Sequence, residues 1–316
     1  MAEAALVVCP GRGTYGKAEL GYLKRHHGDK AELIGAFDRL RSERGQPTLS
    51  ELDAAERFSP ALHTRGDIAS PLIFAASYAD FLAIDRSRFE IAAVTGNSMG
   101  WYTALAVAGA VGAEQAFRIV DEGEQVLALA DSIGTRDGCR LHVSIELGGM
   151  IVFAGNEAGL AALLAEAPPT PAREPLRLVN HGPFHTPLMA GSSERALAQL
   201  PVEWFGSPEA PMIDGRGHFW RPFATNAAAL RDYTFVAQIL ETYDFTRAIQ
   251  VAVREQAPDR IILLGPGDTL GGAIAQALIA IQWRGLRSKR DFQEMQAGDP
   301  FLLALGREEQ RALVAG

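Results

Sequence analysis

The chain has 316 residues, 47% of them hydrophobic, and carries a net charge of −8 at neutral pH. This length and composition allow one or two globular domains with a substantial buried core. The acidic balance argues against general nucleic-acid binding, and the apolar runs are too short and too interrupted to span a bilayer.

The N-terminal residues lack the basic start of a secretory signal peptide. The two cysteines, Cys9 and Cys139, are too few for a disulfide scaffold. We therefore expect a cytoplasmic protein. Nothing in the sequence requires an assembly larger than a monomer.

The first part of the chain alternates between strand and helix patterns. Residues 5–9 are apolar like a buried strand and run into a Pro-Gly-x-Gly turn at residues 10–13. The apolar spacing predicts a buried helix over residues 68–82 and an amphipathic helix over residues 113–130. Between them, residues 89–94 predict a second buried strand.

That second strand leads into a Gly-x-Ser-x-Gly motif at residues 96–100, which small, helix-compatible residues follow. A strand, a tight turn and a helix with a serine at the corner form a nucleophile elbow, in which the hydroxyl is exposed at the helix N-terminus. Backbone N–H groups there can stabilise a developing oxyanion. The motif also occurs by chance, but this context favours Ser98 as a nucleophile.

The middle of the chain changes to short alternating strands. Residues 138–145 and 149–155 predict two strands, and residues 159–167 predict a short helix. A proline-rich break at residues 168–171 precedes a third predicted strand at residues 176–179.

The remaining chain again alternates between strand and helix patterns. Strands are predicted at residues 211–214 and 260–264. Helices are predicted at residues 188–200, 224–242, 245–256 and 269–281. From residue 283 the chain is basic and then weakly helical. A mainly parallel sheet covered by helices is the most economical arrangement, so the fold class is α/β.

A nucleophilic serine needs a base, and His185 is the best candidate among the seven histidines. It lies in a loop constrained by Gly182, Pro183 and Pro187 before a predicted helix, although such a histidine can equally be a surface residue. His181 and His185 have the spacing of helical metal ligands. The Gly-Pro pair between them forbids a helix, so we expect no metal site.

Five motifs agree with these assignments and lie in one order along the chain. They are Cys-Pro-Gly-Arg-Gly-Thr at 9–14, Ala-Ser-Pro-Leu-Ile at 69–73, Gly-Asn-Ser-Met-Gly at 96–100, Phe-His-Thr-Pro-Leu-Met at 184–189 and Leu-Gly-Pro-Gly at 264–267. Together they resemble the malonyl-CoA:acyl carrier protein transacylases and the acyltransferase domains of polyketide synthases.

The resemblance implies an α/β-hydrolase-like core with a mainly parallel sheet and a small inserted ferredoxin-like subdomain. We assign residues 1–127 and 193–316 to the large catalytic domain and residues 128–192 to the subdomain. The two strands after residue 137 leave little room for a helix between them, so the subdomain is expected to be shortened.

The resemblance also implies a mechanism. Ser98 attacks the carbonyl of an acyl-CoA while His185 takes its proton, and the backbone N–H groups of Met99 and Arg12 form the oxyanion hole. The family has glutamine at the position of Arg12, but a backbone donor does not depend on its side chain. The acyl-serine then passes its acyl group to the phosphopantetheine thiol of an acyl carrier protein. Coenzyme A thioester is thus a substrate, and no cofactor is bound permanently.

In this family a backbone carbonyl, rather than an acid, orients the catalytic imidazole. We expect the matching carbonyl near Glu241 or Thr242. Asp244 and Asp268 are alternative orienting groups, although both are better explained as residues that start helices.

The acyl group is less well defined, because the family's malonyl-binding arginine aligns with Gly123. Losing such a buried partner of a carboxylate should cost roughly 2–5 kcal/mol. One hypothesis is that Arg12 supplies the missing charge from the opposite loop. Alternatively, Arg12 points to solvent or to the phosphates of coenzyme A.

Three further positions are expected to line the acyl pocket. Asn97 stands where the family has histidine, and Ser70 where it has glutamine. Phe184, before the base, matches members that use the small malonyl unit rather than the branched methylmalonyl unit.

Three functions are compatible with these residues. The first is an acyltransferase of fatty acid or polyketide biosynthesis, with malonyl as the family default or another acyl group in its place. The second is a hydrolase that clears acyl chains from carrier proteins, which the missing arginine favours. The third is a non-catalytic binding protein, against which the presence of both Ser98 and His185 argues.

An acidic carrier protein would need a local basic surface on this acidic chain. Two clusters are candidates, although each can equally be ordinary solvated surface. They are Arg284, Arg287, Lys289 and Arg290 in one, and Lys24, Arg25 and Lys30 in the other.

Overall fold

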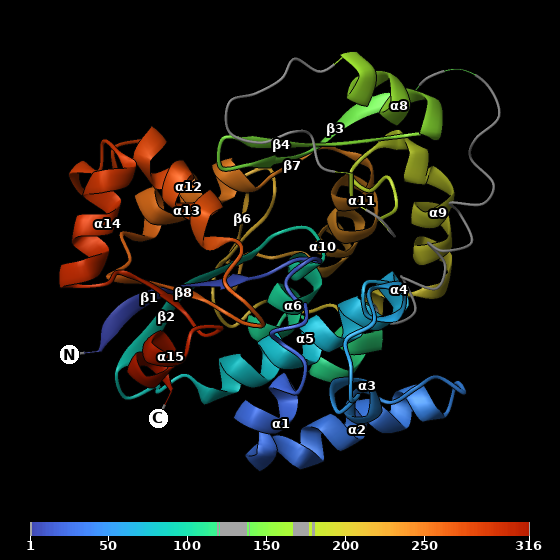
Figure 1. Ribbon diagram of the computed structural model, residues 1–316, viewed down its shortest axis with the longest axis horizontal. Helices are drawn as coiled ribbons and strands as arrows, with labels where there is room; N and C mark the ends of the chain where they lie inside the picture. The colour runs from blue at the N-terminus through green and yellow to red at the C-terminus, as the bar shows by residue number, and fades with distance from the viewer. Residues whose placement is uncertain are drawn as a thin grey trace.

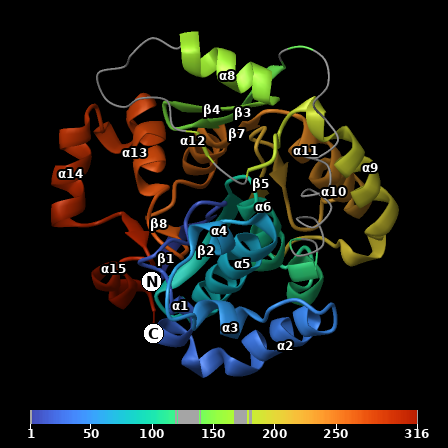
Figure 2. The same cartoon turned by 45° about the vertical axis from the view of Figure 1, so that its right-hand side comes forward.

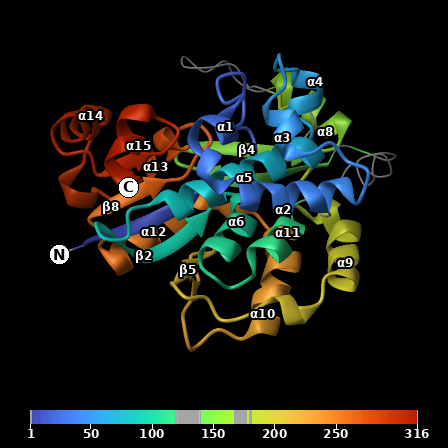
Figure 3. The same ribbon diagram turned by 90° about the horizontal axis from the view of Figure 1, so that it is seen from below.

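The computed structural model describes residues 2–118, 120, 138, 140–166, 177, 178 and 181–315. Within them, two β-sheets lie among helices, and the larger sheet forms the centre of the molecule (Figure 1). The smaller sheet lies at the top of Figure 2, under α8 (Glu157–Glu166). The two chain ends lie on the same side of the molecule in all three ribbon views (Figure 3).

The large sheet has six strands in the order β6-β5-β2-β1-β8-β9. All neighbours pair in parallel except β6, which is antiparallel to β5. The strands are β1 (Glu3–Cys9), β2 (Phe89–Gly96), β5 (Met212–Ile213), β6 (Phe219–Trp220), β8 (Arg260–Leu263) and β9 (Leu302–Ala304). The predicted α/β class with a mainly parallel sheet is therefore confirmed.

Alternate residues of β1 point to opposite faces of this sheet, as the strand geometry requires. Val7 and Cys9 join a core formed with α5 (Gly66–Ala83) and α6 (Gly100–Val107). Leu6 joins a second core on the other face. That second core contains residues of α12 (Phe245–Gln256) and α13 (Gly271–Ala280). Because both faces are covered, β1 is apolar throughout its buried length.

Further helices surround these layers. In the N-terminal part they are α1 (Tyr22–His26), α2 (Ala31–Ser42), α3 (Leu49–Asp53) and α4 (Pro60–His63). In the C-terminal part they are α9 (Ala190–Gln199), α10 (Ala227–Asp232), α11 (Gln238–Leu240), α14 (Lys289–Gly298) and α15 (Glu308–Val314). No helix in the described ranges is both long and apolar enough to cross a membrane.

The small sheet has the order β4-β3-β7. The strands β3 (Leu141–Leu147) and β4 (Met150–Gly155) form an antiparallel hairpin. Its turn residues, Gly148 and Gly149, both have positive φ angles, as a two-residue hairpin turn favours. The third strand is β7 (Tyr243–Asp244), which pairs in parallel with β3.

A strand was predicted at residues 176–179. The structure describes residues 177 and 178 of this range, and neither is in a strand, so the prediction is wrong there. The third strand comes instead from two residues that precede α12. A two-residue strand carries no periodicity of its own, so only its long-range pairing with β3 defines it.

Two other predictions need correction. The single helix expected over residues 224–242 begins only at Ala227, where the Asn226 side chain caps it, and a π-helical segment η4 (Tyr233–Ala237) interrupts it. The short edge strand β9 lies in the tail, where only weak helix was expected. The helix predicted over residues 113–130 is helical at 113–118 and 120, and the rest lies outside the described residues.

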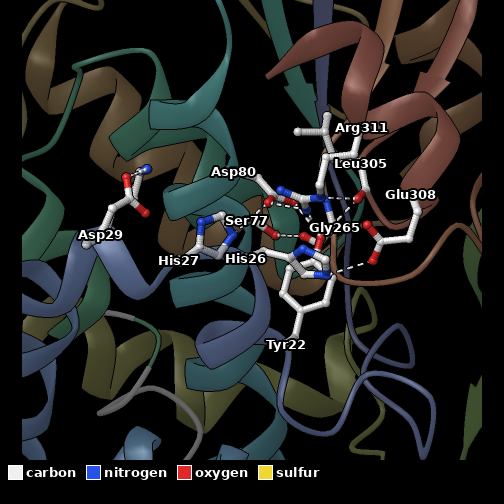
Figure 4. Close-up of polar contacts among 11 residues, drawn as sticks. Tyr22, His26, His27, Asp29, Ser77, Asp80, Gly265, Leu305, Glu308 and Arg311 are labelled. Carbon is white, nitrogen blue, oxygen red and sulfur yellow. Dashed lines mark hydrogen bonds and ion pairs between the residues drawn. The ribbon is translucent and has the colours of Figure 1, made fainter. Parts of the chain in front are cut away.

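A buried polar cluster centred on Asp80 of α5 joins the two ends of the chain (Figure 4). Its carboxylate lies 2.5 Å from Nη2 of Arg311, 2.8 Å from Nε2 of His27 and 2.9 Å from the hydroxyl of Tyr22. It also accepts a hydrogen bond of 2.7 Å from the backbone N–H of Gly265. The cluster thereby connects α1, α5, α15 and the loop after β8.

In this cluster the negative charge of Asp80 is balanced by the positive charge of Arg311. Burial alone would raise the pKa of Asp80, but the hydrogen bond from His27 and the positive charge of Arg311 together lower it. The cluster also explains the first glycine of the Leu-Gly-Pro-Gly motif. A Cβ atom at Gly265 would lie 2.0 Å from the hydroxyl oxygen of Tyr22, so no side chain fits there.

We predict that Arg311→Met lowers the free energy of unfolding by about 3–5 kcal/mol, because it leaves the Asp80 charge buried without its cation. Urea denaturation of the two proteins measures the difference. The control is Arg307→Met, because Arg307 is half exposed and only pairs with surface acids; it should cost less than about 1 kcal/mol. Equal effects of the two substitutions would contradict the prediction.

Candidate active site

Ser98 lies at a sharp turn between β2 and α6. Its φ angle is 53°, in the left-handed region that non-glycine residues rarely adopt. The flanking glycines make the turn possible. A Cβ atom at Gly96 would lie 2.3 Å from the carbonyl of Gly100, and one at Gly100 would lie 2.2 Å from the carbonyl oxygen of Cys9. The predicted sharp turn with Ser98 at its corner is therefore present in the structure, and the role of Ser98 as a nucleophile stays a prediction.

The structure brings Ser98 and His185 together. Oγ of Ser98 lies 2.8 Å from Nε2 of His185. The other ring nitrogen, Nδ1, lies 2.5 Å from the backbone carbonyl oxygen of Gln238. A carbonyl oxygen only accepts, so Nδ1 carries the hydrogen and Nε2 of the neutral ring is free to accept the proton of Ser98.

His185 is 1% exposed. Burial lowers its pKa from 6.5 to about 4, and the hydrogen bond to the Gln238 carbonyl opposes this shift only in part. The imidazole is therefore neutral at physiological pH. A neutral imidazole in contact with a serine hydroxyl is the arrangement that general-base catalysis requires.

The loop that carries His185 is held at several points. The hydroxyl of Thr186 donates to the carbonyl of Pro183 at 2.6 Å and caps the short helix η2 (Pro187–Met189). From the small sheet, the hydroxyl of Ser144 in β3 donates to the carbonyl of Phe184 at 3.0 Å. The small sheet therefore helps to position His185.

The carbonyl that accepts from His185 lies three to four residues earlier than predicted: it belongs to Gln238, not to Glu241 or Thr242. The short helix α11 ends at Leu240, and the last carbonyls of a helix lack partners within it. One of them is therefore available to His185. A prediction based on a regular helix over residues 224–242 could not locate this end.

Neither acidic alternative orients the base. Asp244 caps α12 by accepting a hydrogen bond of 2.7 Å from the backbone N–H of Arg247. Asp268 lies 3.7 Å from Arg307 at the surface. The alternative explanation, a residue that starts a helix, is therefore confirmed for Asp244. It is not confirmed for Asp268, because α13 has Leu270 at its N-cap and no side-chain cap.

The two predicted oxyanion-hole residues flank the elbow. Met99 immediately precedes α6, where the first N–H groups of a helix have no intrahelical partner. Arg12 follows Gly11, at which a Cβ atom would lie 2.5 Å from the carbonyl oxygen of Asn97. The loop after β1 thus packs directly on the elbow, and the role of both N–H groups stays a prediction.

The side chain of Arg12 is partly buried, and its Nη2 donates a hydrogen bond of 3.2 Å to the carbonyl of Thr64. Thr64 lies between α4 and α5. The predicted pairing of Arg12 with an acyl carboxylate stays a prediction. Gly123, the position of the family's arginine, lies outside the described residues.

The predicted pocket residues have different surroundings. Asn97 is buried beside Ser98, and its Oδ1 has no hydrogen-bond partner in the described part of the chain. Ser70 is buried on α5, which packs against α6. Phe184 is partly buried, with its ring centre 6.0 Å from that of His185. Their roles in substrate binding stay predictions.

Sequence reasoning missed two residues beside the Ser98–His185 pair, Gln238 and Tyr243. The side chain of Gln238 donates to the carbonyl of Ser98 at 3.0 Å. The hydroxyl of Tyr243 donates to the carbonyl of Gly96 at 2.6 Å, and its ring centre lies 5.4 Å from that of His185. Neither residue lies in a recognisable motif, because β7 and α11 are too short to show a pattern.

The described residues contain no group of three or more histidine, cysteine or acidic side chains that could hold a metal ion. In the two basic clusters, several side chains have partners within the chain. Lys30 pairs with Asp29 at 2.7 Å, Arg290 pairs with Glu294 at 2.7 Å, and Arg284 donates to the carbonyl of Pro258 at 2.8 Å.

The chain is similar to proteins of known structure or name. No family model matches the chain. The malonyl CoA-acyl carrier protein transacylase of Salmonella typhimurium is 23% identical over 203 residues, which are 57% of this chain and 64% of that protein. The protein of the same name from Escherichia coli K12 is 24% identical over the same shares. The aligned segment thus spans less than two thirds of these relatives.

Solved structures match over nearly the whole chain. An acyl-carrier-protein S-malonyltransferase from Burkholderia pseudomallei has a TM-score of 0.76 and 19% identity, covering 99% of both chains. A malonyl-CoA:acyl carrier protein transacylase from Xanthomonas oryzae has a TM-score of 0.75 and 21% identity, covering 100% of both. A malonyl-transacylase in complex with its type II polyketide acyl-carrier protein has a TM-score of 0.70 and 19% identity.

These likenesses confirm the resemblance that the five motifs indicated. The low identity, at most 24% among the proteins named here, marks a divergent sequence. The chain has the fold of the malonyl-CoA:acyl carrier protein transacylases.

Proposed function

We propose that this chain is an acyltransferase that moves an acyl group from coenzyme A to the phosphopantetheine thiol of an acyl carrier protein. The supporting observation is the neutral, buried His185 in contact with Ser98 at the N-terminus of α6. The names of the similar proteins make malonyl the proposed acyl group and fatty acid or polyketide biosynthesis the proposed setting. The acyl-CoA is a substrate, and the reaction needs no permanently bound cofactor.

The first half-reaction forms an acyl-enzyme. Oγ of Ser98 attacks the thioester carbonyl carbon as its proton moves to Nε2 of His185, while the hydrogen on Nδ1 stays bonded to the Gln238 carbonyl. The N–H groups of Met99 and Arg12 stabilise the oxyanion, each worth about 3 kcal/mol. The tetrahedral intermediate then expels the coenzyme A thiolate, which takes the proton from His185 and leaves as the thiol.

The second half-reaction reverses these roles. The carrier's thiol gives its proton to His185 and attacks the carbonyl of the acyl-serine. The carbon–oxygen bond to Ser98 breaks, Ser98 recovers its proton from His185, and the acyl group leaves as a carrier thioester. Two half-reactions that share one enzyme intermediate give ping-pong kinetics.

The acyl pocket and the domain division belong to the same proposal. Asn97, Ser70 and Phe184 line the acyl pocket, and Arg12 binds the free carboxylate of a malonyl group. Residues 128–192 form the subdomain beside a large domain of residues 1–127 and 193–316. The hydrogen bonds of His185, in the proposed subdomain, with Ser98 and Gln238 of the large domain support a site at the junction of these two parts.

A hydrolase that clears acyl groups from carrier proteins is the second candidate. It differs only in the acceptor, because water then attacks the acyl-serine instead of a thiol. The glycine at position 123 favours it, since a hydrolase does not need to select a carboxylate. The lifetime of the acyl-enzyme in buffer separates the two functions.

We predict that malonyl-CoA adds one malonyl group to the wild-type protein and none to Ser98→Ala, as measured by intact-protein mass spectrometry. The adduct should persist in buffer and move to a holo carrier protein when that is added. An adduct that disappears in buffer at the same rate with and without carrier would identify the hydrolase. Absence of an adduct from malonyl-, acetyl- and longer acyl-CoAs would contradict both functions.

The pH dependence of acylation should reflect the low pKa of His185. The neutral ring is the base, so kcat/KM should stay nearly constant as the pH falls through 6.5 and decrease only as it approaches about 4. Steady-state assays in buffers of constant ionic strength, with circular dichroism to verify folding, measure this profile. An acidic limb with an apparent pKa near 6.5 would show that the base is not the buried imidazole.

The proposed carboxylate partner is tested by Arg12→Ala, which keeps the backbone N–H. It should lower kcat/KM for malonyl-CoA by about 30-fold or more, corresponding to about 2 kcal/mol. Acetyl-CoA, which has no free carboxylate, should react nearly as before. Arg65→Ala, at an exposed arginine paired with Asp67, is the control. Equal losses for both substrates would contradict a carboxylate-binding role of Arg12.

A further inference from the structure

Gln238 makes direct contact with both members of the proposed catalytic pair. Its backbone carbonyl accepts the Nδ1 hydrogen of His185, and its side-chain Nε2 donates to the backbone carbonyl of Ser98 at 3.0 Å. Its Oε1 accepts a hydrogen bond of 3.0 Å from the hydroxyl of Tyr102 in α6. The residue is 2% exposed, so these bonds form away from bulk water.

The orientation of this amide is determined by its partners. A backbone carbonyl can only accept, so the NH2 end must face Ser98, and the oxygen end is left for the hydroxyl of Tyr102. Both ends of the amide are therefore used. Glutamate at this position would offer a negatively charged acceptor to another acceptor, and a hydrocarbon of equal length would form neither bond.

The elbow needs such support, because Ser98 has a left-handed backbone. A non-glycine residue in that region costs of order 1–3 kcal/mol and persists only when its surroundings hold it there. On one side, the carbonyl of Gly96 is held by the hydroxyl of Tyr243. On the other side, the carbonyl of Ser98 is held by Gln238, in addition to the N–H of Trp101 at 3.0 Å.

The segment that carries Gln238 is itself anchored to the helix after the nucleophile. Nε1 of Trp101 donates to the hydroxyl of Thr234 at 3.0 Å, and Thr234 lies in the π-helical segment η4 directly before Gln238. A π-helical segment adds a residue to a helix and rotates the next residues about the helix axis, and it occurs frequently at functional sites. Here it directs the backbone carbonyl of Gln238 toward His185 and the side chain of Gln238 toward the carbonyl of Ser98.

We infer that Gln238 is a positioning residue. Its side chain holds the backbone of Ser98 in place, while its backbone carbonyl orients the imidazole of His185. Gln238 thereby fixes both partners of the contact between Oγ of Ser98 and Nε2 of His185. The inference rests on the proposed function only in taking Ser98 as the nucleophile. It requires no particular acyl group and no particular acceptor.

The test compares Gln238→Met with the wild type in two reactions. The first is acylation of Ser98 by malonyl-CoA under single-turnover conditions. The second is labelling of Ser98 by a fluorophosphonate, a general probe of activated serines. Both rate constants should fall by about ten- to a hundredfold, because small misplacements of reacting groups have effects of that size. The KM for malonyl-CoA should stay unchanged, since both ends of the Gln238 amide are bonded to protein groups.

Gln250→Met is the matched control. Gln250 lies in α12 and, like Gln238, donates its amide to a backbone carbonyl, that of Ala277 at 3.1 Å, although it is partly rather than fully buried. Its substitution should leave both rate constants within about twofold of the wild type. Tyr102→Phe removes the outer bond of the Gln238 amide and should slow both reactions severalfold, which keeps the inference testable if Gln238→Met does not fold.

The outcomes separate the two proposals. Wild-type rates in Gln238→Met and Tyr102→Phe, with losses of thermal stability like that of Gln250→Met, would overturn the positioning role. Fluorophosphonate labelling that depends on Gln238, with no acylation from any acyl-CoA, would support the inference while the proposed transferase fails. A higher KM with an unchanged rate constant would place Gln238 in substrate binding and would also overturn the inference.

Discussion

The hydrogen bond of 2.8 Å between Oγ of Ser98 and Nε2 of His185 is the contact on which the proposed chemistry depends. The two residues are far apart in the sequence, and each has a left-handed backbone. Neither conformation is stable in an isolated loop. The surrounding structure must therefore supply the free energy that keeps both turns in place.

The parallel sheet supplies most of that support. Because β1 and β2 are adjacent and parallel, their carboxyl ends bring the loop after Cys9 against the elbow, where glycines permit a close approach. The small sheet holds the loop of His185 through Ser144. A backbone carbonyl replaces an acid as the partner of Nδ1, so burial dominates the pKa of the base and leaves it neutral. A neutral base suits the reversible proton transfers of the proposed acyl exchange.

Elements that depend on a local sequence pattern were predicted correctly. The buried strands β1 and β2 and the helix α12 were predictable from apolar periodicity, and the Ser98 elbow from its glycines. The errors arise where structure depends on distant partners. The two residues of β7 form a strand only by pairing with β3. The π-helical segment before Gln238 shifts the carbonyl that meets His185, and no apolar pattern reports that shift.

The most direct test of the central claim is to locate the acyl group. The protein would be treated with radiolabelled malonyl-CoA, digested at acidic pH, and its labelled peptide sequenced by tandem mass spectrometry, for the wild type and for His185→Ala. We predict that the label lies on Ser98 in the wild type. In the variant, the rate of labelling should fall about a hundredfold or more. A label on another residue, or equal labelling without His185, would contradict the proposed Ser98–His185 mechanism.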